Sequence, residues 1–374
     1  MRVIITAGGT GGHIYPAISI INKIKEKESD SKFLYIGTHN RMEKDIVPSL
    51  GYDYKSIEIY GFSKKNIKLD FKNVGLIYKA YKECLKIIKE FKPDIVIGVG
   101  GYVTFPVIMA AHKLKIKTFL HEQNAIPGKS NKFLTKYADK IGISFEESSK
   151  YFPKDKWILT GNPCSENALN IKTTSRTKYG LTYDKKSILI VQGSLGSEVI
   201  NNKMLDFLKS IDDKNYEVLY VTGKNYYDSF SKNKFSKNVK IVPFVENLSS
   251  LLKDIDLIIT RAGASTIAEI TAIGLPAILI PSPYVANNHQ YYNALELKNS
   301  GCGEILEEKD LTSGCLNNKI KELINDKNKY QEIKNNLGKN KTINSSEIIY
   351  QNIKELIKNE RNMWDIRGRF LKKI

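Results

Sequence analysis

A glycine-rich run directly before a histidine is the part of this sequence that most clearly carries chemistry. Residues 8–12 read GGTGG, follow the short apolar stretch 3–5, and lead into His13. Glycines allow a sharp turn and a close approach of the backbone to a ligand, and the amides at the start of a following helix favour negative charge. An imidazole at that position is well suited to take a proton near neutral pH. We therefore expect an anion-binding turn with His13 as a candidate general base.

This run differs from two familiar phosphate-binding motifs. A dinucleotide-binding turn would need a glycine where Ile14 stands, and an acid after the second strand, where residues 36–38 read IGT. A nucleoside-triphosphate loop would need Gly-Lys followed by Ser or Thr, which residues 8–15 do not contain. The alternative interpretation is a strand-to-helix turn whose histidine does no chemistry.

A second anion-binding turn is expected in the other half of the chain. Residues 261–266 read RAGAST, follow the apolar stretch 257–260, and open a predicted helix. The amides of Ala264, Ser265 and Thr266 would face a ligand phosphate. Glu269 lies one turn further on, on the face of Ser265, where its carboxylate could accept two hydrogen bonds from a ribose diol. Alternatively, Glu269 only interacts with the helix dipole.

Three further polar stretches could bind a sugar or its phosphates. Residues 193–197 (GSLGS) offer Ser194 beside flexible backbone, and Gln290 stands in the first turn of another predicted helix. Residues 121–124 (HEQN) follow an apolar strand, which suits sugar recognition because buried hydroxyls need hydrogen-bond partners. An ordinary polar cap for Gln290 and a plain loop for 121–124 are the alternatives.

The composition is that of a globular protein with two domains. The chain has 374 residues, 41% of them hydrophobic and 26% charged. We find no apolar stretch of about 18 residues, and the N-terminus enters a strand directly, so we expect neither a membrane span nor a secretory signal. The four cysteines have no C-x-x-C spacing, and no D-x-D-like pair follows a strand, so we expect no disulfides, no metal and no cofactor.

The net charge of +18 limits the expected partners. It favours nucleic acid, an anionic membrane surface or ligands that carry phosphate. The charge comes mainly from lysines spread along predicted helices, and the sequence has no arginine-aromatic RNA signature. We therefore expect no nucleic-acid partner.

Short β-branched stretches alternate with helical periodicity, which is typical of parallel sheets covered by helices. We expect strands near residues 2–7, 33–37, 94–99, 117–120, 140–143 and 157–160, then near 187–191, 217–222, 239–243, 256–260, 276–280 and 303–306. In the first half, helices are expected near 14–27, 41–49, 71–91, 103–114 and 128–137.

The two halves show a weak repeat that predicts two similar α/β domains. Residues 94–101 (DIVIGVGG) and 256–263 (DLIITRAG) are displaced by 162 positions, and each leads into a threonine and a helix. Two doubly wound sheets that face each other would place the carboxyl ends of their strands around one interdomain cleft, where ligands of such sheets bind. Chance similarity between two α/β domains is the alternative explanation for the repeat.

Taken together, these motifs resemble the MurG family of bacterial N-acetylglucosaminyltransferases over residues 1–310. The resemblance rests on segments that occur in the order and approximate spacing of that family: 8–13, 100–103 (GGYV), 121–124, 161–163 (GNP), 193–196, 261–269 and 289–290 (HQ). It implies a GT-B fold, in which two Rossmann-like domains face each other across a cleft. The implied domains are 1–162, which faces the acceptor and the membrane, and 163–346, which binds UDP-GlcNAc. A C-terminal helix at about 347–374 would pack back on the first domain.

The resemblance also implies a reaction and assigns residues to it. N-acetylglucosamine would move from UDP-GlcNAc, with inversion, to the C4 hydroxyl of N-acetylmuramic acid in lipid I, giving lipid II for peptidoglycan. His13 is the expected base and Glu122 the alternative candidate. Glu269 would hold the ribose, and the backbone of Val245 would contact the uracil. The other implied donor contacts are Thr10, Gly11, Gly12, Asn124, Ser194, Ala264, Ser265, Thr266 and Gln290.

Two positions depart from the family pattern. Cys164 follows the GNP segment where the family usually carries an arginine, so that donor contact is not transferred to this chain. Gln192 replaces the customary first glycine before Gly193, which puts the expected shape of the 193–196 loop in doubt.

Lipid I is anchored in the inner membrane, so the resemblance implies a peripheral enzyme at the cytoplasmic face, with an anionic lipid surface and proteins of cell-wall synthesis and division as partners. The loop 60–65 and the basic end 361–373 are candidate membrane contacts. A helical apolar stripe beside lysines is interpreted as core of the first domain and alternatively as a lipid-facing surface. It comprises Phe71, Val74, Tyr78, Tyr81, Leu85 and Ile88.

Other functions remain open at this point. A different GT-B enzyme, such as a UDP-sugar:diacylglycerol glycosyltransferase or a UDP-GlcNAc epimerase, would share most of these motifs. A nucleotide-sugar-binding protein of the division machinery would bind the donor without turnover.

Overall fold

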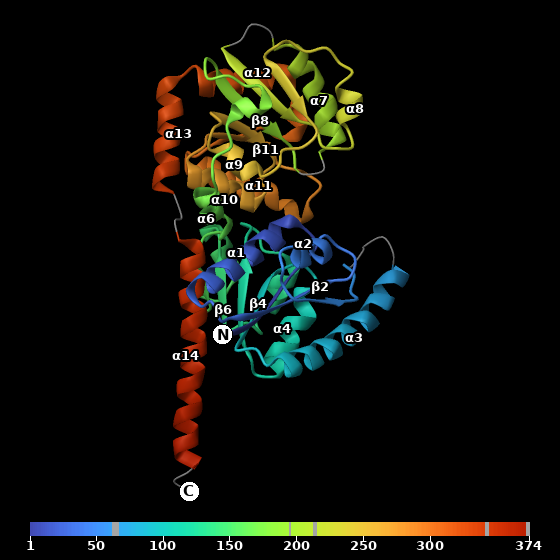
Figure 1. Ribbon diagram of the computed structural model, residues 1–374, viewed down its shortest axis with the longest axis vertical. Helices are drawn as coiled ribbons and strands as arrows, with labels where there is room; N and C mark the ends of the chain where they lie inside the picture. Colours follow the sequence, from blue (N-terminus) through green and yellow to red (C-terminus); the bar gives the residue numbers. More distant parts are fainter. Residues whose placement is uncertain (62–66, 194–195, 212–214, 341–343, 372–374) are drawn as a thin grey trace. The chain divides into compact units, whose positions relative to one another are not determined.

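The computed structural model describes residues 1–61, 67–193, 196–211, 215–340 and 344–371, and the side chains of 67–72 and 360–371 are outside that description. The chain divides into two compact units. The first comprises Met1–Pro163 with Asn344–Ile374, and the second comprises Cys164–Ile343 (Figure 1). Each unit is built on its own parallel sheet.

The first unit contains a seven-stranded sheet in the order β3-β2-β1-β4-β5-β6-β7. The order reverses between β1 and β4, and this switch point is where doubly wound sheets bind ligands. Its strands are β1 (Arg2–Ala7), β2 (Lys32–Thr38), β3 (Tyr54–Ile57), β4 (Ile95–Gly100), β5 (Lys117–Glu122), β6 (Lys140–Ile143) and β7 (Trp157–Leu159). Its helices are α1 (Gly11–Lys27), α2 (Glu43–Ser49), α3 (Ile67–Phe91), α4 (Thr104–Lys113), α5 (Lys129–Leu134) and α14 (Ser345–Leu371).

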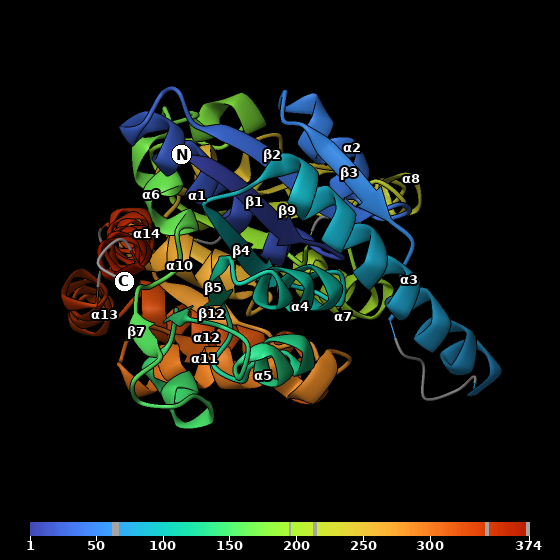
Figure 2. The same ribbon diagram turned by 90° about the horizontal axis from the view of Figure 1, so that it is seen from below.

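Alternate residues of the central strands supply two separate cores, one on each face of this sheet. Val3 and Ile5 of β1 face α1 and α14, whereas Ile4 between them faces α3 and α4. Figure 2 shows the two helix pairs on opposite sides of β1 and β4. Because both faces are covered, the strands are apolar along their whole length, as expected for a parallel sheet.

The C-terminal helix α14 is held to the first unit by apolar and charged contacts. Ile349 and Ile353 are buried against α1 in the core of that face. Burial alone would raise the pKa of the Glu28 carboxyl, but hydrogen bonds from Lys354, the N-terminal ammonium and Tyr350 lower its pKa to about 2. Glu28 therefore stays ionised and links the end of α1 to α14.

The second unit repeats the same arrangement with six strands, in the order β10-β9-β8-β11-β12-β13. Its strands are β8 (Lys186–Val191), β9 (Tyr216–Val221), β10 (Val239–Val242), β11 (Leu257–Thr260), β12 (Ala277–Leu279) and β13 (Glu304–Ile305). Its helices are α6 (Cys164–Asn170), α7 (Glu198–Lys209), α8 (Tyr227–Phe230), α9 (Leu248–Leu252), α10 (Ala264–Ile273), α11 (His289–Asn299), α12 (Ser313–Ile324) and α13 (Lys327–Lys339).

The two aspartates of the sequence repeat occupy equivalent positions in the two sheets. Asp94, before β4, accepts a hydrogen bond from the backbone N–H of Arg2 in β1 at 2.7 Å. Asp256, before β11, accepts one from the backbone N–H of Ser187 in β8 at 2.9 Å. In each unit, the carboxylate ties the start of one strand to its neighbour at the switch point, so the sequence repeat corresponds to a repeated structural role.

The expected α/β class with two parallel sheets is confirmed. Strand β3 and helix α6 are among the elements that were not expected from the sequence. Strand β3 is a four-residue edge strand with a partly exposed, mixed sequence (YKSI), so it lacks the apolar stretch that marks the other strands. Helix α6 starts directly after Pro163, in a segment where too few apolar residues recur to predict a helix.

Replacing Ile353 by alanine should destabilise the first unit, because the side chain is fully buried between α14 and α1. We expect a loss of about 2–5 kcal/mol in the free energy of unfolding. Both tryptophans, Trp157 and Trp364, belong to this unit, so urea unfolding followed by tryptophan fluorescence reports on it selectively. Lys358→Ala on an exposed position of the same helix should change the value by less than about 0.5 kcal/mol. Equal urea midpoints for Ile353→Ala and Lys358→Ala would contradict the packing role of α14.

Candidate functional site

The switch point of the first unit brings two glycine-containing loops into backbone contact. The N–H of Gly8, directly after β1, donates to the carbonyl oxygen of Gly100 at the end of β4, at 3.2 Å. At Gly101, where φ is +89°, a Cβ atom would lie 2.5 Å from the Gly8 carbonyl oxygen. No other residue type fits such an approach without displacing the backbone, so the loops after β1 and β4 form one surface.

His13 lies in the first turn of α1, and its ring is held in one tautomer. Its Nδ1 is 3.0 Å from the Gly8 carbonyl oxygen. Because a carbonyl oxygen can only accept, Nδ1 carries the hydrogen in the neutral ring and Nε2 carries the lone pair. A Cβ atom at Gly100 would lie 2.9 Å from Nε2, so the glycine at that position makes room for the imidazole. The arrangement orients an imidazole whose Nε2 atom can act as a proton acceptor.

Thr10, Gly11 and Gly12 form the start of the same helix. Thr10 is the N-cap residue with an extended backbone, and its carbonyl oxygen accepts the N–H of His13 at 3.1 Å. Its side chain makes no capping hydrogen bond, and both Thr10 and Gly12 are exposed. The first amides of a helix have no partner within the helix, so this turn is suited to an anionic ligand.

Glu43 supports this loop, and sequence reasoning missed it. Its carboxylate is buried and accepts hydrogen bonds from the N–H of Gly9 at 3.2 Å, and from the N–H and hydroxyl of Thr38 at 3.1 and 2.6 Å. A Cβ atom at Gly8 would lie 2.5 Å from Glu43 Oε1. The acid therefore connects the end of β2 to the glycine-rich turn. Nothing in the local sequence marks it, because its partner Gly9 is 34 residues away.

Two side chains of the polar run 121–124, His121 and Gln123, are internal to the first unit, which corrects the expectation that they recognise a sugar. His121 is fully buried, donates from Nε2 to the Gly161 carbonyl at 3.0 Å, and accepts from Gln123 at Nδ1. Burial lowers the pKa of His121 to about 4, although the Gly161 carbonyl opposes the shift. Gln123 also donates to the Val99 carbonyl, so both side chains connect neighbouring strands.

Glu122 is buried and accepts four hydrogen bonds from its own loop. Asn124 donates to Oε1 from its backbone N–H and its side chain, at 3.0 and 3.2 Å. The N–H of Gly128 and the side chain of Asn131 donate to Oε2, at 3.1 and 2.9 Å. Both oxygens of this carboxylate therefore already accept hydrogen bonds from the protein. The geometry therefore favours His13 over Glu122 as the base, and it gives Glu122 the role of holding the half-buried Asn124.

The second unit has its own switch point, between β8 and β11. The buried side chain of Gln192 donates to the Ile259 carbonyl at 3.4 Å, and the guanidinium of Arg261 donates to Ser197 Oγ at 3.4 Å. Gln192, which departs from the family pattern, thus bridges the two strands. The expected donor contact Ser194 lies outside the described residues.

Arg261 itself is bound within the second unit. Its Nη1 lies 2.7 Å from Oε2 of the buried Glu308 and donates to the Ile280 carbonyl at 3.2 Å. These contacts connect the loop after β11 to the loops after β12 and β13. Arg261 therefore holds the turn in place, and the following residues are the ones that can meet a phosphate.

Ala264, Ser265 and Thr266 form the first turn of α10, after the N-cap residue Gly263. Ala264 is buried, whereas Ser265 and Thr266 are half-buried. Ser265 Oγ has no hydrogen-bond partner among the described residues. The structure thus places a hydroxyl and several helix-start amides together at the carboxyl end of β11.

Glu269 lies on the next turn of α10, and its environment disfavours the ionised form. Burial raises the pKa of its carboxyl to about 7, although a hydrogen bond from Ser249 Oγ, at 3.0 Å, acts in the opposite direction. A ligand that offers hydroxyl donors would stabilise the carboxylate. Ser249 in α9 is the second residue that sequence reasoning missed.

Gln290 and Val245 come from other loops at the carboxyl edge of the same sheet. The Oε1 atom of Gln290, in the first turn of α11, accepts the backbone N–H of Ser282 at 2.9 Å. This bond fixes the amide, so its NH₂ group is the end that can donate to a ligand. Val245 is buried in the loop between β10 and α9. The loops after β10, β11 and β12 therefore supply these side chains.

No group of three or more His, Cys, Asp or Glu side chains in the described part of the chain could hold a metal ion.

Two family models match the chain, one in each unit. The glycosyltransferase family 28 N-terminal domain matches residues 3–143, and the glycosyltransferase family 28 C-terminal domain matches residues 187–349. A protein of Bacillus cytotoxicus is 44% identical over 329 residues, 87% of this chain and 90% of its own length. A protein of Pediococcus pentosaceus is 40% identical over 362 residues, which cover 96% of this chain and 100% of that protein. Both are named UDP-N-acetylglucosamine–N-acetylmuramyl-(pentapeptide) pyrophosphoryl-undecaprenol N-acetylglucosamine transferase.

Solved structures show the same fold. MurG of Acinetobacter baumannii matches with a TM-score of 0.75 and 24% identity, over 95% of this chain and 99% of its own. The UDP-GlcNAc 2-epimerase of Neisseria meningitidis matches with a TM-score of 0.67 and 16% identity, over 95% of this chain and 100% of its own. At these identities the likeness concerns the fold alone, which is the GT-B architecture expected from the sequence.

The buried His121 should make the first unit sensitive to acid. The unfolded chain takes a proton on this residue near pH 6.5, whereas the folded protein takes one only near pH 4, so stability should fall as the pH is lowered through this window. The contribution of His121 to this fall is at most about 3 kcal/mol.

The measurement is the urea midpoint by tryptophan fluorescence at several pH values between 7 and 4. His121→Gln should be less stable at pH 7, because the Gly161 contact is disturbed, and its stability should depend less on pH. If the two proteins gave parallel pH curves, the neutral buried state of His121 would be refuted.

Proposed function

Because the chain belongs to the MurG family of N-acetylglucosaminyltransferases, within glycosyltransferase family 28, we propose that it transfers N-acetylglucosamine from UDP-GlcNAc to lipid I. The acceptor atom is the C4 hydroxyl of N-acetylmuramic acid, and the product is lipid II for peptidoglycan. The observation that carries the chemistry is the orientation of His13, whose Nδ1–H is fixed by the Gly8 carbonyl at 3.0 Å.

His13 acts as the general base. Nε2 accepts the proton of the C4 hydroxyl while the oxygen attacks C1 of the donor sugar, and UDP leaves from the opposite side, so the anomeric centre inverts. The Gly8 carbonyl stabilises the resulting imidazolium through Nδ1–H. A positioned base of this kind typically contributes about 10²–10⁴ in rate. Glu122 supports the site by holding the loop that carries Asn124.

The donor is bound through the loops of the second unit. The amides of Ala264, Ser265 and Thr266 at the start of α10 bind the diphosphate and stabilise its charge as it leaves. Glu269 accepts hydrogen bonds from the ribose hydroxyls, Gln290 donates to the sugar, and the backbone of Val245 contacts the uracil. Ser194 and, from the first unit, Thr10, Gly11, Gly12 and Asn124 remain predicted donor contacts.

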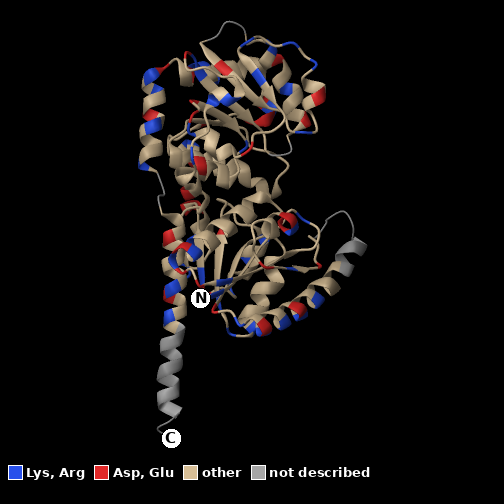
Figure 3. Cartoon of the chain, viewed as in Figure 1, with Lys and Arg blue, Asp and Glu red and all other residues tan. Residues whose placement is uncertain are grey.

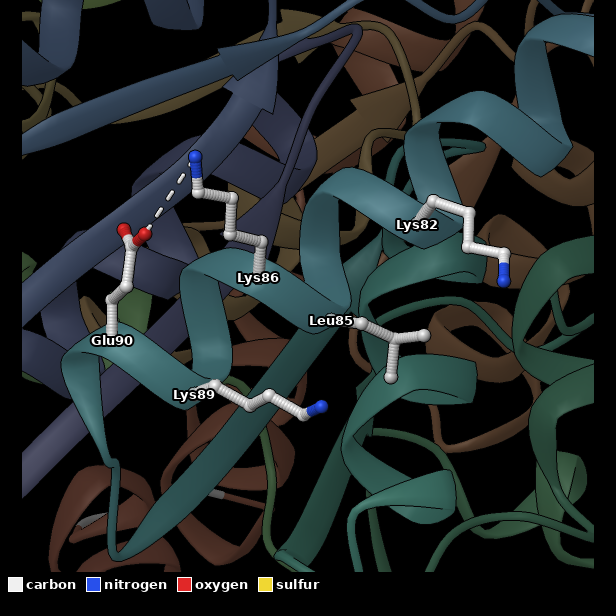
Figure 4. A pocket seen from close by; sticks show the side chains of 5 residues that line it. All are labelled: Lys82, Leu85, Lys86, Lys89 and Glu90. Atoms are coloured by element: carbon white, nitrogen blue, oxygen red, sulfur yellow. Dashed lines mark ion pairs between the residues drawn. The ribbon is translucent and has the colours of Figure 1, made fainter.

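We also propose that the enzyme works at the cytoplasmic face of the membrane, on an anionic lipid surface, with proteins of cell-wall synthesis and division as partners. No helix in the described residues is long and apolar enough to cross a bilayer. Helix α3 supports a peripheral contact, because it carries several lysines along its length (Figure 3). Lys82, Lys86 and Lys89 line a pocket on this helix together with Leu85 and Glu90, and Lys86 pairs with Glu90 there (Figure 4).

The apolar stripe of α3 is divided between the core and the surface. Ile88 is buried, and Tyr81 and Leu85 pack against the core, whereas Val74 and Tyr78 are 57% and 62% exposed. The exposed pair lies toward the N-terminal end of α3, near the lysines, and it supports a contact with lipid. Phe71 and the basic end, with the side chains of the loop 62–65, are outside the described residues.

His13→Ala should lower turnover by about 10²–10⁴ while leaving the affinity for UDP nearly unchanged, because the base acts on the acceptor hydroxyl. The assay is the transfer of radiolabelled N-acetylglucosamine from UDP-GlcNAc to lipid I, with UDP affinity measured by calorimetry. His112→Ala, at an exposed histidine of α4, should retain full activity. Wild-type turnover by His13→Ala would remove His13 from this role.

The same assay separates the other candidate functions. Label that enters diacylglycerol instead of lipid I would indicate a glycolipid glycosyltransferase, and conversion of free UDP-GlcNAc would indicate an epimerase. Binding of UDP-GlcNAc without any product would indicate a protein that only senses the nucleotide sugar.

Donor binding should depend on pH through Glu269. Because the pKa of this carboxyl is about 7 in the free protein, UDP affinity should increase as the pH rises through 7, and binding should release a proton. Calorimetry in two buffers of different ionisation enthalpy measures that release. Glu269→Gln should weaken UDP binding by about tenfold or more and remove the pH dependence. Glu332→Gln on the exposed face of α13 should leave both unchanged. A pH-independent affinity in the wild type would contradict the ribose contact.

A further inference from the structure

We propose that Arg41 and Tyr102 form a binding subsite for an oxyanion of the acceptor, which is either its diphosphate or a carboxylate of its peptide. This inference rests on the proposed function and adds a specificity-determining contact on the acceptor side of that reaction. It starts from the one arginine of the described side chains that is not bound to an acid or a carbonyl of its own chain.

The guanidinium and the phenol lie side by side at the carboxyl edge of the first sheet. Nε of Arg41 donates to the hydroxyl of Tyr102 at 3.3 Å. Arg41 follows β2, and Tyr102 follows β4, so two separate loops supply the pair. The hydrogen bond to Tyr102 raises the pKa of Arg41, which is charged at every relevant pH. This bond uses Nε only, and the two Nη groups of a planar guanidinium can bind a carboxylate or a phosphate with two parallel hydrogen bonds.

Both residues are coupled to the turn that carries His13. Arg41 stands two positions before Glu43, whose carboxylate accepts the N–H of Gly9 at 3.2 Å. Tyr102 directly follows Gly101, which packs on the Gly8 carbonyl. The subsite therefore borders the glycine-rich turn through short, rigid connections. An acceptor anion bound there would hold the acceptor on the unit that supplies the base.

Residues 58–61, which follow β3, form a third side of the subsite. Tyr60 among them is held by the buried Asn73 of α3, which accepts the Tyr60 N–H at 3.2 Å and donates to its carbonyl. The hydroxyl of Tyr60 lies 3.2 Å from Nε2 of His39, in the loop of Arg41. At Gly61, a Cβ atom would lie 3.3 Å from the Tyr102 ring, so the loop rests against that ring. Three loops thus fix the surroundings of one cation before any ligand binds.

Arg41 differs from the other arginines whose side chains the structure describes. Arg2 donates to the Phe91 carbonyl, Arg176 pairs with Asp256, and Arg261 pairs with Glu308. Arg41 is exposed and takes part in none of the ion pairs found among the described residues. Its neighbour Glu43 is no substitute partner, because that carboxylate already accepts three hydrogen bonds from Gly9 and Thr38. The cation is therefore oriented by Tyr102; the charge of Glu43 acts on it, but no ion pair found among the described residues includes it.

The test compares Arg41→Ala, Arg41→Lys and the control Lys44→Ala in the full-length protein. Lys44 is an exposed cation in the same helix region, so it controls for the general loss of positive charge. We expect Arg41→Ala to raise the KM for lipid I by about 10–100-fold, the usual effect of losing a hydrogen bond to a charged group. The KM for UDP-GlcNAc and the affinity for UDP should stay unchanged. Arg41→Lys should raise the KM for lipid I less than Arg41→Ala does, because lysine keeps the positive charge but cannot make the bidentate hydrogen bonds of arginine.

Two modified acceptors distinguish the sources of the anion. One carries amides in place of the peptide carboxylates, and the other carries one phosphate in place of the diphosphate. If the subsite binds the diphosphate, Arg41→Ala loses its effect only on the monophosphate acceptor. If it binds a peptide carboxylate, the effect disappears only on the amidated acceptor.

An Arg41→Ala protein with the wild-type KM for lipid I would overturn the subsite, and so would an equal change in donor KM. A wild-type protein that transfers no sugar to lipid I would instead refute the proposed function, so the two failures are distinguishable. Tyr102→Phe gives a second readout. It keeps the ring against Gly61 but removes the hydroxyl that orients Arg41, so a smaller rise in the same KM is expected.

Discussion

The backbone contact between Gly8 and the pair Gly100–Gly101 is the constraint on which the rest of the first unit's site depends. It requires the absence of side chains at the switch point, since a Cβ at position 101 would lie 2.5 Å from the Gly8 carbonyl oxygen. The same carbonyl accepts Nδ1–H of His13, and the space at Gly100 accommodates the ring. One carbonyl group thus fixes both the loop packing and the tautomer of the base. A substitution that shifted this loop would change the histidine's orientation without touching its ring.

The second unit uses the same topology for a different purpose. Its switch-point loops are connected by side chains, through Gln192 and Arg261, where the first unit uses glycine contacts. The start of α10 has backbone amides and the hydroxyls of Ser265 and Thr266 as its polar groups. Two sheets with one strand order therefore present the histidine that we propose as the base in one case, and the helix start that we propose as the diphosphate site in the other. The two units differ in the residues of these loops, whereas the sheets place the loops at equivalent positions.

The sequence predicted the elements that have a local signature. The central strands were predicted because both of their faces are buried, which makes them continuously apolar, and the two turns were predicted from glycine and small residues beside a strand. Glu43 and Ser249 could not be predicted, because each acts on a residue that is distant in sequence, Gly9 and Glu269. Within the run 121–124, His121 and Gln123 were misinterpreted for a related reason. A polar side chain at a strand end can serve a ligand or a neighbouring strand, and only the positions of Gly161 and Val99 show that His121 and Gln123 serve the strands.

Two buried titratable groups are shifted in opposite directions, and the signs separate structure from binding. Burial keeps His121 neutral in the folded protein. The free energy of unfolding therefore falls as the pH is lowered from about 6.5 to 4, where the unfolded chain binds a proton on this residue more readily. For Glu269, burial raises the pKa from 4.5 to about 7, so ionisation destabilises the free protein as the pH rises through that range. At neutral pH the Glu269 carboxyl is therefore only about half ionised, and among the described residues Ser249 donates a side-chain hydrogen bond to it. Ribose hydroxyls would supply the missing donors, so the destabilisation present in the empty site becomes part of the free energy of donor binding.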